Sequence, residues 1–211
     1  MSEQLLLIFE IIGTVAFAFS GAMVGLSRKM DIFGVTVLGI VTAVGGGVIR
    51  DIVLGLTPPA TFKNPVYISV AIAVSIILFI PSVRRFLFKK QNAFDKAMLF
   101  MDSVGLGIFT AVGVETACIA EHRNLFLLVF VGMITGIGGG VLRDVLSGNT
   151  PYIFVKHFYA SASLIGALVF IVLWKIFGQS AATLGCAFSV TVLRLLAAKF
   201  RWSLPKAAED F

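Results

Sequence analysis

Two pairs of opposite charges stand at equivalent places in a strongly apolar sequence. Arg50 and Asp51 occur in GGGVIRDIVLGLTP, residues 45–58, and Arg143 and Asp144 occur in GGGVLRDVLSGNTP, residues 138–151. Nine of the fourteen positions in the two segments are identical. Charged groups at membrane depth are costly, so they mark an ion or substrate path or form a structural ion pair. Both interpretations are open for these four residues.

The charged pairs are predicted to find partners on other helices. Consecutive residues on a helix point about 100° apart, so Arg50 is not expected to neutralise Asp51 side by side, nor Arg143 to neutralise Asp144. Partners from the other copy of the motif would lock the two copies together, which is the structural alternative to a pore lining. Two further acids, Glu10 and Asp102, either add to an acidic path for cations or lie near the headgroups.

Each charged pair follows three consecutive glycines. Three glycines weaken a helix by about 1 kcal/mol each relative to alanine and permit non-helical backbone. We therefore expect a break in both helices, with freed carbonyls that face each other or an aqueous path. The predicted ion pathway comprises Gly45, Gly46, Gly47, Arg50, Asp51, Gly138, Gly139, Gly140, Arg143, Asp144, Thr42, Thr135, Ser20 and Thr110.

Packing is the alternative role for several of these small residues. Thr42 and Thr135 either line the path or bond the carbonyl four residues earlier, and the second is the commoner outcome. Close helix packing is the expected role of Gly21, Gly25, Gly132 and Gly136.

The composition places these motifs in a membrane protein. Hydrophobic residues make up 58% of the 211 residues and charged residues 13%, against about 25% charged in soluble domains. A spanning helix needs roughly 20 mostly apolar residues. Seven such stretches are predicted, over residues 5–26, 32–54, 66–83, 97–120, 125–147, 153–177 and 181–198. The fold class is therefore all-α integral membrane, with seven transmembrane helices.

Basic residues favour one orientation in the membrane. Cytoplasmic loops carry an excess of Lys and Arg. One side would hold Arg28, Lys29, Arg84, Arg85, Lys89, Lys90, Lys96, Lys156, Lys199, Arg201 and Lys206, and the other only Lys63, Arg123 and Lys175. The N-terminus is expected outside and the C-terminus in the cytoplasm, in a bacterial inner membrane if the source is bacterial. Arg194 is expected to reach the interface from the last span.

The duplication predicts two inverted units. The two glycine motifs are 93 residues apart, and Gly39 recurs as Gly132 at the same offset. FSGA at residues 19–22 is weakly similar to FTAV at 109–112, which pairs Ser20 with Thr110. Each unit has three crossings, so the two units must lie in opposite orientations, as in many transport proteins. The expected division is 1–96 for the first unit with its basic loop, 97–178 for the second, and 179–211 for a seventh helix and tail.

Nothing in the sequence indicates an enzyme. G-x-S-x-G, Walker and GxGxxG patterns are absent. Cys118 and Cys186 lie in apolar stretches, where a buried thiol acts as a small hydrophobe. We expect no cofactor, no disulfide, no nucleic-acid partner and no metal beyond permeant ions.

The doubled GGGxxRDxxxG motif, the seven spans and the inverted units resemble the prokaryotic trimeric intracellular cation (TRIC) channels. The motif is similar to that of the bacterial branch, whose repeat has also been called a glycine-transporter-like domain. The resemblance covers about residues 5–200. It implies a homotrimer in membrane lipid, with one pore per subunit between the helices at 32–54 and 125–147. It also implies permeation by monovalent cations, chiefly potassium, with K⁺ or Na⁺ and bound lipid as the only ligands.

The lysine-bearing motif of the animal TRIC channels is replaced here by GGGVIRD, so gating by voltage and lipid of the animal kind is not expected from the resemblance.

Two other functions are compatible with the same residues. A secondary transporter of a small zwitterion such as glycine would also use inverted units and buried charges, with Arg50 or Arg143 holding the carboxylate. A membrane scaffold would use the charges only to lock its halves together.

Overall fold

The chain is an all-helical bundle in the computed structural model, which describes residues 3–88, 91–122, 124–155 and 158–202. For residues 3–5, 86, 88 and 91–93 it describes the backbone only. The helices are α1 (Glu3–Ser27), α2 (Ile32–Val53), α3 (Ala60–Lys63), α4 (Val66–Phe79), α5 (Pro81–Phe88), α6 (Gln91–Ile119), α7 (Leu125–Leu146), α8 (Tyr152–Val155), α9 (Tyr159–Phe177) and α10 (Gln179–Lys199). Five of the basic residues on which the predicted membrane orientation depends lie outside the described residues: Lys89, Lys90, Arg123, Lys156 and Lys206.

Within the described part of the chain, six helices are long and apolar enough to cross a membrane. The predicted 66–83 stretch is instead divided into α4, of 14 residues, and α5. Ile80, which precedes Pro81, leaves the helical region with ψ 128°, because proline disfavours a helical conformation in the residue before it. At 1.5 Å per residue α4 is about 21 Å long, shorter than the hydrocarbon layer of about 30 Å.

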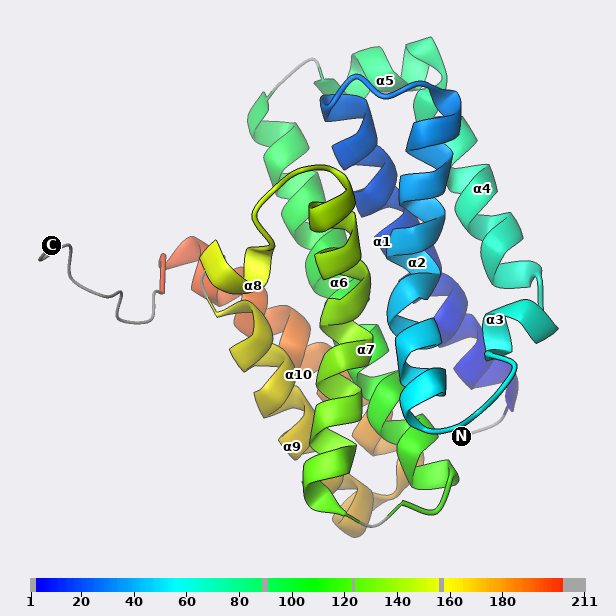
Figure 1. The fold of residues 1–211 in the computed structure, drawn as a ribbon. Helices are drawn as coiled ribbons and strands as arrows, with labels where there is room; N and C mark the ends of the chain where they lie inside the picture. Colours follow the sequence, from blue (N-terminus) through cyan, green and yellow to red (C-terminus); the bar gives the residue numbers. More distant parts are fainter. Residues whose placement is uncertain (1–2, 89–90, 123, 156–157, 203–211) are drawn as a thin grey trace, which may run out of the picture.

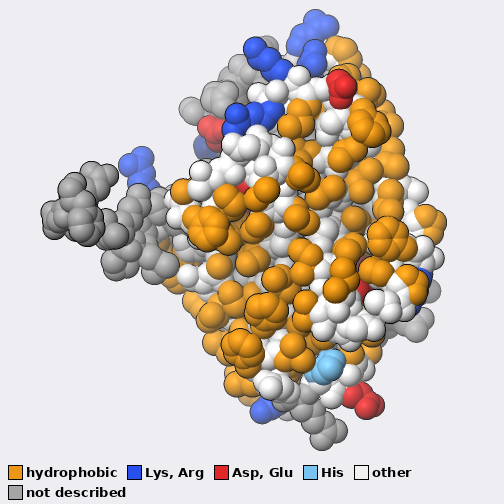
Figure 2. Space-filling view, in the orientation of Figure 1, with side chains coloured by type: hydrophobic (Ala, Val, Ile, Leu, Met, Phe, Trp, Pro, Cys, Tyr) orange, Lys and Arg blue, Asp and Glu red, His pale blue; other side chains and the backbone are white. Residues whose placement is uncertain are grey.

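The helices pack in two groups that meet where α2 contacts α7 and where α1 contacts α6 (Figure 1). One group contains α1, α2 and α4, and the other contains α6, α7 and α9, with α10 packed against α6 and α9. The helices α2 and α7 run in opposite directions. Figure 2 shows hydrophobic side chains over most of the visible surface and charged side chains gathered toward its ends, as expected of a bundle that lies in lipid.

The two central helices begin and end with the same local chemistry. The side chain of Asp31 accepts a bond from Gly34 N at 2.7 Å, and that of Asn124 accepts bonds from Phe126 N and Leu127 N. Both are N-caps, which satisfy backbone amides that the first turn leaves unpaired. Both helices are followed by a glycine with φ of 70°, Gly55 and Gly148, which provides the left-handed residue that commonly ends a helix. The fourth glycine of each motif is thus a helix terminator.

A buried carboxylate attaches α10 to α6. Glu115 on α6 is fully buried and accepts hydrogen bonds from Gln179 and, at 2.7 Å, from Thr183 Oγ1. Hydrogen bonds to a charged acceptor are the stronger kind. These contacts come from the first and second turns of α10, so they fix the end of this helix that lies farthest from the cluster around Arg143 described below.

Removal of one of these bonds is expected to loosen α10. Thr183→Val keeps the shape of the side chain but removes one of the two donors to Glu115, the one at Oε2, which should cost about 1.5–3 kcal/mol of stability. The matched control is Thr116→Val, because Thr116 Oγ1 bonds only its own helix at Val112 O, 2.8 Å away. Thermal unfolding in detergent measures both variants. Equal shifts of the midpoint would show that the contact between α10 and α6 does not depend on this bond.

Candidate functional site

The two glycine triplets bring the backbones of α2 and α7 into contact. A Cβ on Gly46 would overlap the carbonyl oxygen of Thr135, and a Cβ on Gly139 would overlap that of Thr42. Both helices run through their triplets without interruption. The predicted helix break, with its freed carbonyls, is therefore wrong. The glycines serve instead to let two antiparallel helices cross with main chain against main chain.

Of the other triplet glycines, Gly138 also faces backbone, whereas Gly45, Gly47 and Gly140 face side chains. A Cβ on Gly45 would overlap Leu142, and one on Gly138 would lie 3.1 Å from the Cα of Gly46. Gly47 and Gly140 point away from the crossing, toward Arg50 and toward the Tyr159 hydroxyl respectively. The expected packing role of the remaining four glycines is confirmed, because a Cβ on Gly21, Gly25, Gly132 or Gly136 would press on a neighbouring helix.

The threonines before the triplets bond their own helices. Thr42 Oγ1 donates to Leu38 O and Thr135 Oγ1 donates to Val131 O, each at 2.6 Å. These are the bonds to the carbonyl four residues earlier that were expected as the commoner outcome. In this arrangement neither hydroxyl proton points into a path.

Ser20 and Thr110 are not equivalent residues, contrary to the prediction. Gly21 packs on Thr42 just as Gly113 packs on Thr135, so α1 and α6 correspond at an offset of 92 and Ser20 corresponds to Val112. Thr110 bonds Ser163 on α9 at 2.7 Å. Ser20 reaches Arg143 on the other group of helices. The segments FSGA and FTAV share only their phenylalanine, so their similarity is too weak to define the offset between the two units.

Each arginine of the motif pairs with the aspartate next to it. Arg50 Nε lies 2.8 Å from Asp51 Oδ1, and Arg143 Nε lies 2.9 Å from Asp144 Oδ1. The prediction that neighbours cannot pair is wrong, because the long arginine side chain curls back although the two Cβ atoms diverge. The second oxygen of each aspartate accepts a bond from a backbone amide after the turn, from Ala60 N at 2.8 Å and from Tyr152 N at 2.9 Å. Each aspartate thus ties its arginine to the first residue of a short helix.

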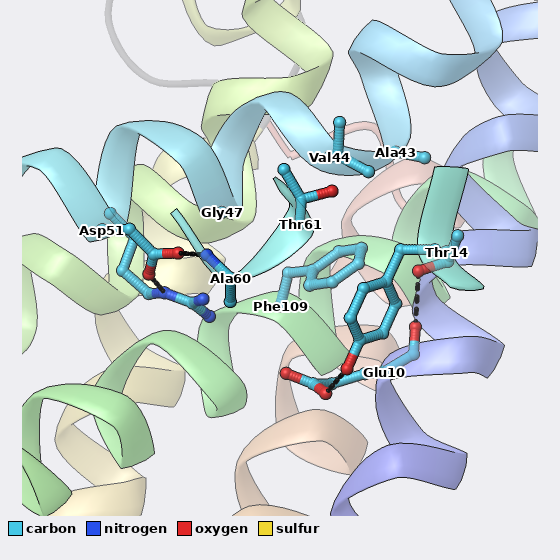
Figure 3. Close-up of a pocket in the computed structure, with 11 residues that line it drawn as sticks. Glu10, Thr14, Ala43, Val44, Gly47, Asp51, Ala60, Thr61 and Phe109 are labelled. Carbon is cyan, nitrogen blue, oxygen red and sulfur yellow. Dashed lines mark hydrogen bonds and ion pairs between the residues drawn. The ribbon is translucent and has the colours of Figure 1, made fainter. Parts of the chain in front are cut away.

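The Arg50 cluster adjoins a small cavity (Figure 3). We give this name to Glu10, Arg50, Asp51 and Tyr67. Tyr67 OH donates a hydrogen bond to Glu10 Oε2. The cavity has a volume of about 40 Å³ and is also lined by Gly47, Thr61 and Phe109. Glu10 and Asp51 face it from different helices. A cavity of this size has room for a water molecule beside these polar groups.

The Arg143 cluster, formed by Asp102, Arg143, Asp144 and Tyr159, is more tightly bonded. Arg143 is 0% exposed. Its Nη1 lies 2.6 Å from Asp102 Oδ1 and also donates to Ser20 Oγ. This contact joins α7 to α6 and to α1, across the two groups of helices. A chamber of about 580 Å³ borders the cluster, lined among others by Asp95, Asp102, Tyr152 and Arg194.

Each cluster has one arginine, two carboxylates and one tyrosine, but the partners within the two clusters differ. Glu10 and Asp102 are 92 positions apart, as are Tyr67 and Tyr159, and the Arg-Asp pairs are 93 apart. In the Arg50 cluster the tyrosine bonds the acid. In the Arg143 cluster the arginine bonds the acid, and among the described residues the Tyr159 hydroxyl has no hydrogen-bond partner. The sequence contained this signal, because the two acids and the two tyrosines recur at one offset.

Arg194 also belongs to this region. It is 3% exposed, and its guanidinium carbon lies 4.6 Å from the centre of the Tyr159 ring. The prediction that it extends to the membrane interface is therefore wrong. A guanidinium over an aromatic face is a favourable cation–π contact, and more so when it is removed from water.

A family model, sequence relatives and solved structures that match this chain all belong to one group of membrane proteins. A family model described as "Glycine transporter" matches residues 7–82 and 99–175. The UPF0126 inner membrane protein YadS of Escherichia coli K12 is 38% identical over 196 residues, which cover 92% of this chain and 91% of that protein. The trimeric intracellular cation channel type A of Danio rerio is 29% identical over 69% of this chain and 52% of that protein.

Solved structures of TRIC channels have the same fold along the whole chain. One TRIC cation channel superposes with a TM-score of 0.86 at 35% identity, covering 100% of both chains. The TRIC channel orthologue from Rhodobacter sphaeroides superposes with a TM-score of 0.83 at 30% identity, covering 94% of this chain and 100% of that one.

Proposed function

Because the chain belongs to the bacterial branch of the TRIC channel family, we propose that it is a monovalent cation channel with potassium as its main permeant ion. The observation that carries this proposal is the pair of polar clusters, one on each side of the α2–α7 crossing, inside an apolar bundle. Each cluster holds one arginine and two carboxylates, so its formal charge is −1, and in the chamber beside the second cluster Asp95 offsets the charge of Arg194. Acidic linings attract cations and repel anions.

We place the ion path in each subunit along the α2–α7 contact. It would lead from the cavity of the Arg50 cluster, past Gly46 and Gly139, to the chamber beside Asp102. Two features close this path in the present arrangement: the main-chain contact of the glycines and the bond of Arg143 to Asp102 and Ser20. Opening would require α7 to shift away from α1 and α6 at Arg143.

We further propose the assembly and orientation that the family resemblance implies. The protein would be a homotrimer with one pore per subunit, in contact with membrane lipid. The short α4 would complete a seventh crossing, with the N-terminus outside and the C-terminus in the cytoplasm. The matched segments 7–82 and 99–175 support two units followed by α10.

Recordings from purified protein in planar bilayers test the proposal. A potassium channel gives unitary currents that reverse near the potassium equilibrium potential in K⁺/Na⁺ gradients. Saturable uptake of labelled glycine into proteoliposomes without unitary currents would instead support the transporter. Neither current nor uptake, with intact trimers, would support the scaffold.

Weakening the contact of Arg143 is expected to increase opening. Ser20→Ala removes the acceptor on α1 that helps hold Arg143 Nη1, so the open probability should rise about tenfold, the effect of roughly 1.4 kcal/mol. The unitary conductance should stay the same, because the path gains no charge. Ser103→Ala is the matched control, since the buried Ser103 hydroxyl bonds its own helix at Leu99 O, 2.6 Å away. An equal effect of both variants would exclude this closing contact.

A further inference from the structure

The helix that stands outside the two matched units supplies a cation to only one of the two clusters. Arg194 lies on α10, and its guanidinium stacks on Tyr159, 4.6 Å from the ring centre. Tyr67, the corresponding tyrosine of the Arg50 cluster, donates its hydroxyl proton to Glu10. The two clusters therefore differ in the surroundings of the tyrosine, because α10 places Arg194 on the Tyr159 ring, whereas Tyr67 bonds Glu10.

We propose that Arg194 is a positioning residue that determines which partner Asp102 takes. The stacked guanidinium holds the Tyr159 ring where its hydroxyl does not bond Asp102, and this leaves Asp102 Oδ1 to Arg143. Without Arg194 the Tyr159 ring would turn and donate to Asp102 Oδ2, which has no hydrogen-bond partner among the described residues, as Tyr67 donates to Glu10 Oε2. A bond at Oδ2 would draw negative charge away from Oδ1 and turn the carboxylate, so the contact of Arg143 with Oδ1 would weaken. The helix α10 thus controls the state of the second cluster.

Two observations and one general rule on buried polar groups support this competition. Arg194 and Asp102 both line the chamber of about 580 Å³, so the arginine and the acid meet in one space. The Tyr159 hydroxyl points toward Gly140, since a Cβ there would lie 2.9 Å from it and 3.8 Å from Arg143 Nη2. The phenol and the Arg143 guanidinium therefore both border Gly140. Buried polar groups strongly favour having a partner, so a released Tyr159 has a driving force to bond Asp102.

A double-mutant cycle on the open probability tests the inference, and this test rests on the proposed channel function. Arg194→Gln is expected to raise the open probability about fivefold in the wild-type background. In a Tyr159→Phe background the same substitution should have no effect, because the phenylalanine has no hydroxyl to compete for Asp102. Arg194→Lys should lie between wild type and Arg194→Gln, because lysine keeps a cation but not the planar group. Equal effects of Arg194→Gln in both backgrounds would overturn the proposal, since a purely structural role predicts them.

A spectroscopic measurement separates this inference from the channel function. The sequence has only three tyrosines, so ¹³C-tyrosine NMR of the trimer in nanodiscs can be assigned with single Tyr→Phe variants. Arg194→Gln should shift the Tyr159 Cζ signal toward the hydrogen-bonded value of Tyr67 and leave Tyr67 unchanged. If this shift occurs in a protein that passes no current, the inference stands and the channel proposal fails. An unmoved Tyr159 signal would refute the inference whatever the currents are.

Discussion

Alanine at Gly46 or Gly139 is expected to destabilise the protein severely, whereas alanine at Gly47 in the same triplet is expected to be tolerated. A Cβ at Gly46 meets the carbonyl oxygen of Thr135 and one at Gly139 meets that of Thr42, and main chain cannot turn aside as a side chain does. Overpacking typically costs about 1–3 kcal/mol and sometimes more. At Gly47 the nearest atom is Arg50 Nη2, 3.9 Å away, and alanine there gains about 1 kcal/mol of helix propensity.

The three alanine variants are compared by thermal unfolding and by the fraction that elutes as a monodisperse peak in detergent. The Gly46 and Gly139 variants should lose several degrees or fail to assemble, while the Gly47 variant matches or exceeds wild type. The broken-helix hypothesis predicts a different order, because alanine would stiffen all three positions of a triplet alike. A stable Gly46→Ala protein would show that α2 and α7 do not cross in main-chain contact.

Most of the fold was predictable because it depends on local sequence. The six long apolar helices follow from hydrophobic runs bounded by residues that favour helix ends, such as Asp31 and Asn124 before α2 and α7. The short α4 was missed because two prolines, Pro65 and Pro81, confine it to 14 residues. The predicted span extended past Pro81 to Val83, because hydropathy alone does not detect where the helix stops.

The candidate site was predictable in its residue types but not in its contacts. The triplets were expected to break helices because glycine weakens an isolated helix. In a membrane an unpaired backbone group costs several kcal/mol, so the helices stay intact and the glycines give close contact instead. The pairing of Arg50 with Asp51 was missed because Cβ directions do not limit a long side chain. The place of Arg194 depends on how α10 docks, which no local pattern specifies.

Glutamine at Arg143 is expected to be far more damaging than glutamine at Arg50, although the two residues occupy the same place in the motif. Arg143 is 0% exposed and bonds Asp102, Asp144 and Ser20. Removing one partner of a buried pair costs about 3–5 kcal/mol, because the other charge stays buried without compensation. Arg50 is 7% exposed beside a cavity, and its described ion pair is with Asp51 alone. Water in this cavity can solvate the remaining carboxylate, so the loss there should be smaller.

A second substitution distinguishes a lost charge pair from simple loss of packing. Asp102→Asn should restore part of the stability of Arg143→Gln, because it removes one of the two carboxylates left uncompensated, and the two amides can bond each other. The same Asp102→Asn change alone should be destabilising, since it takes a charged acceptor from Arg143. Unfolding free energies of the four proteins give the coupling between the residues. Additive effects, or equal losses for Arg50→Gln and Arg143→Gln, would show that burial of the Arg143 pair does not decide the stability of this cluster.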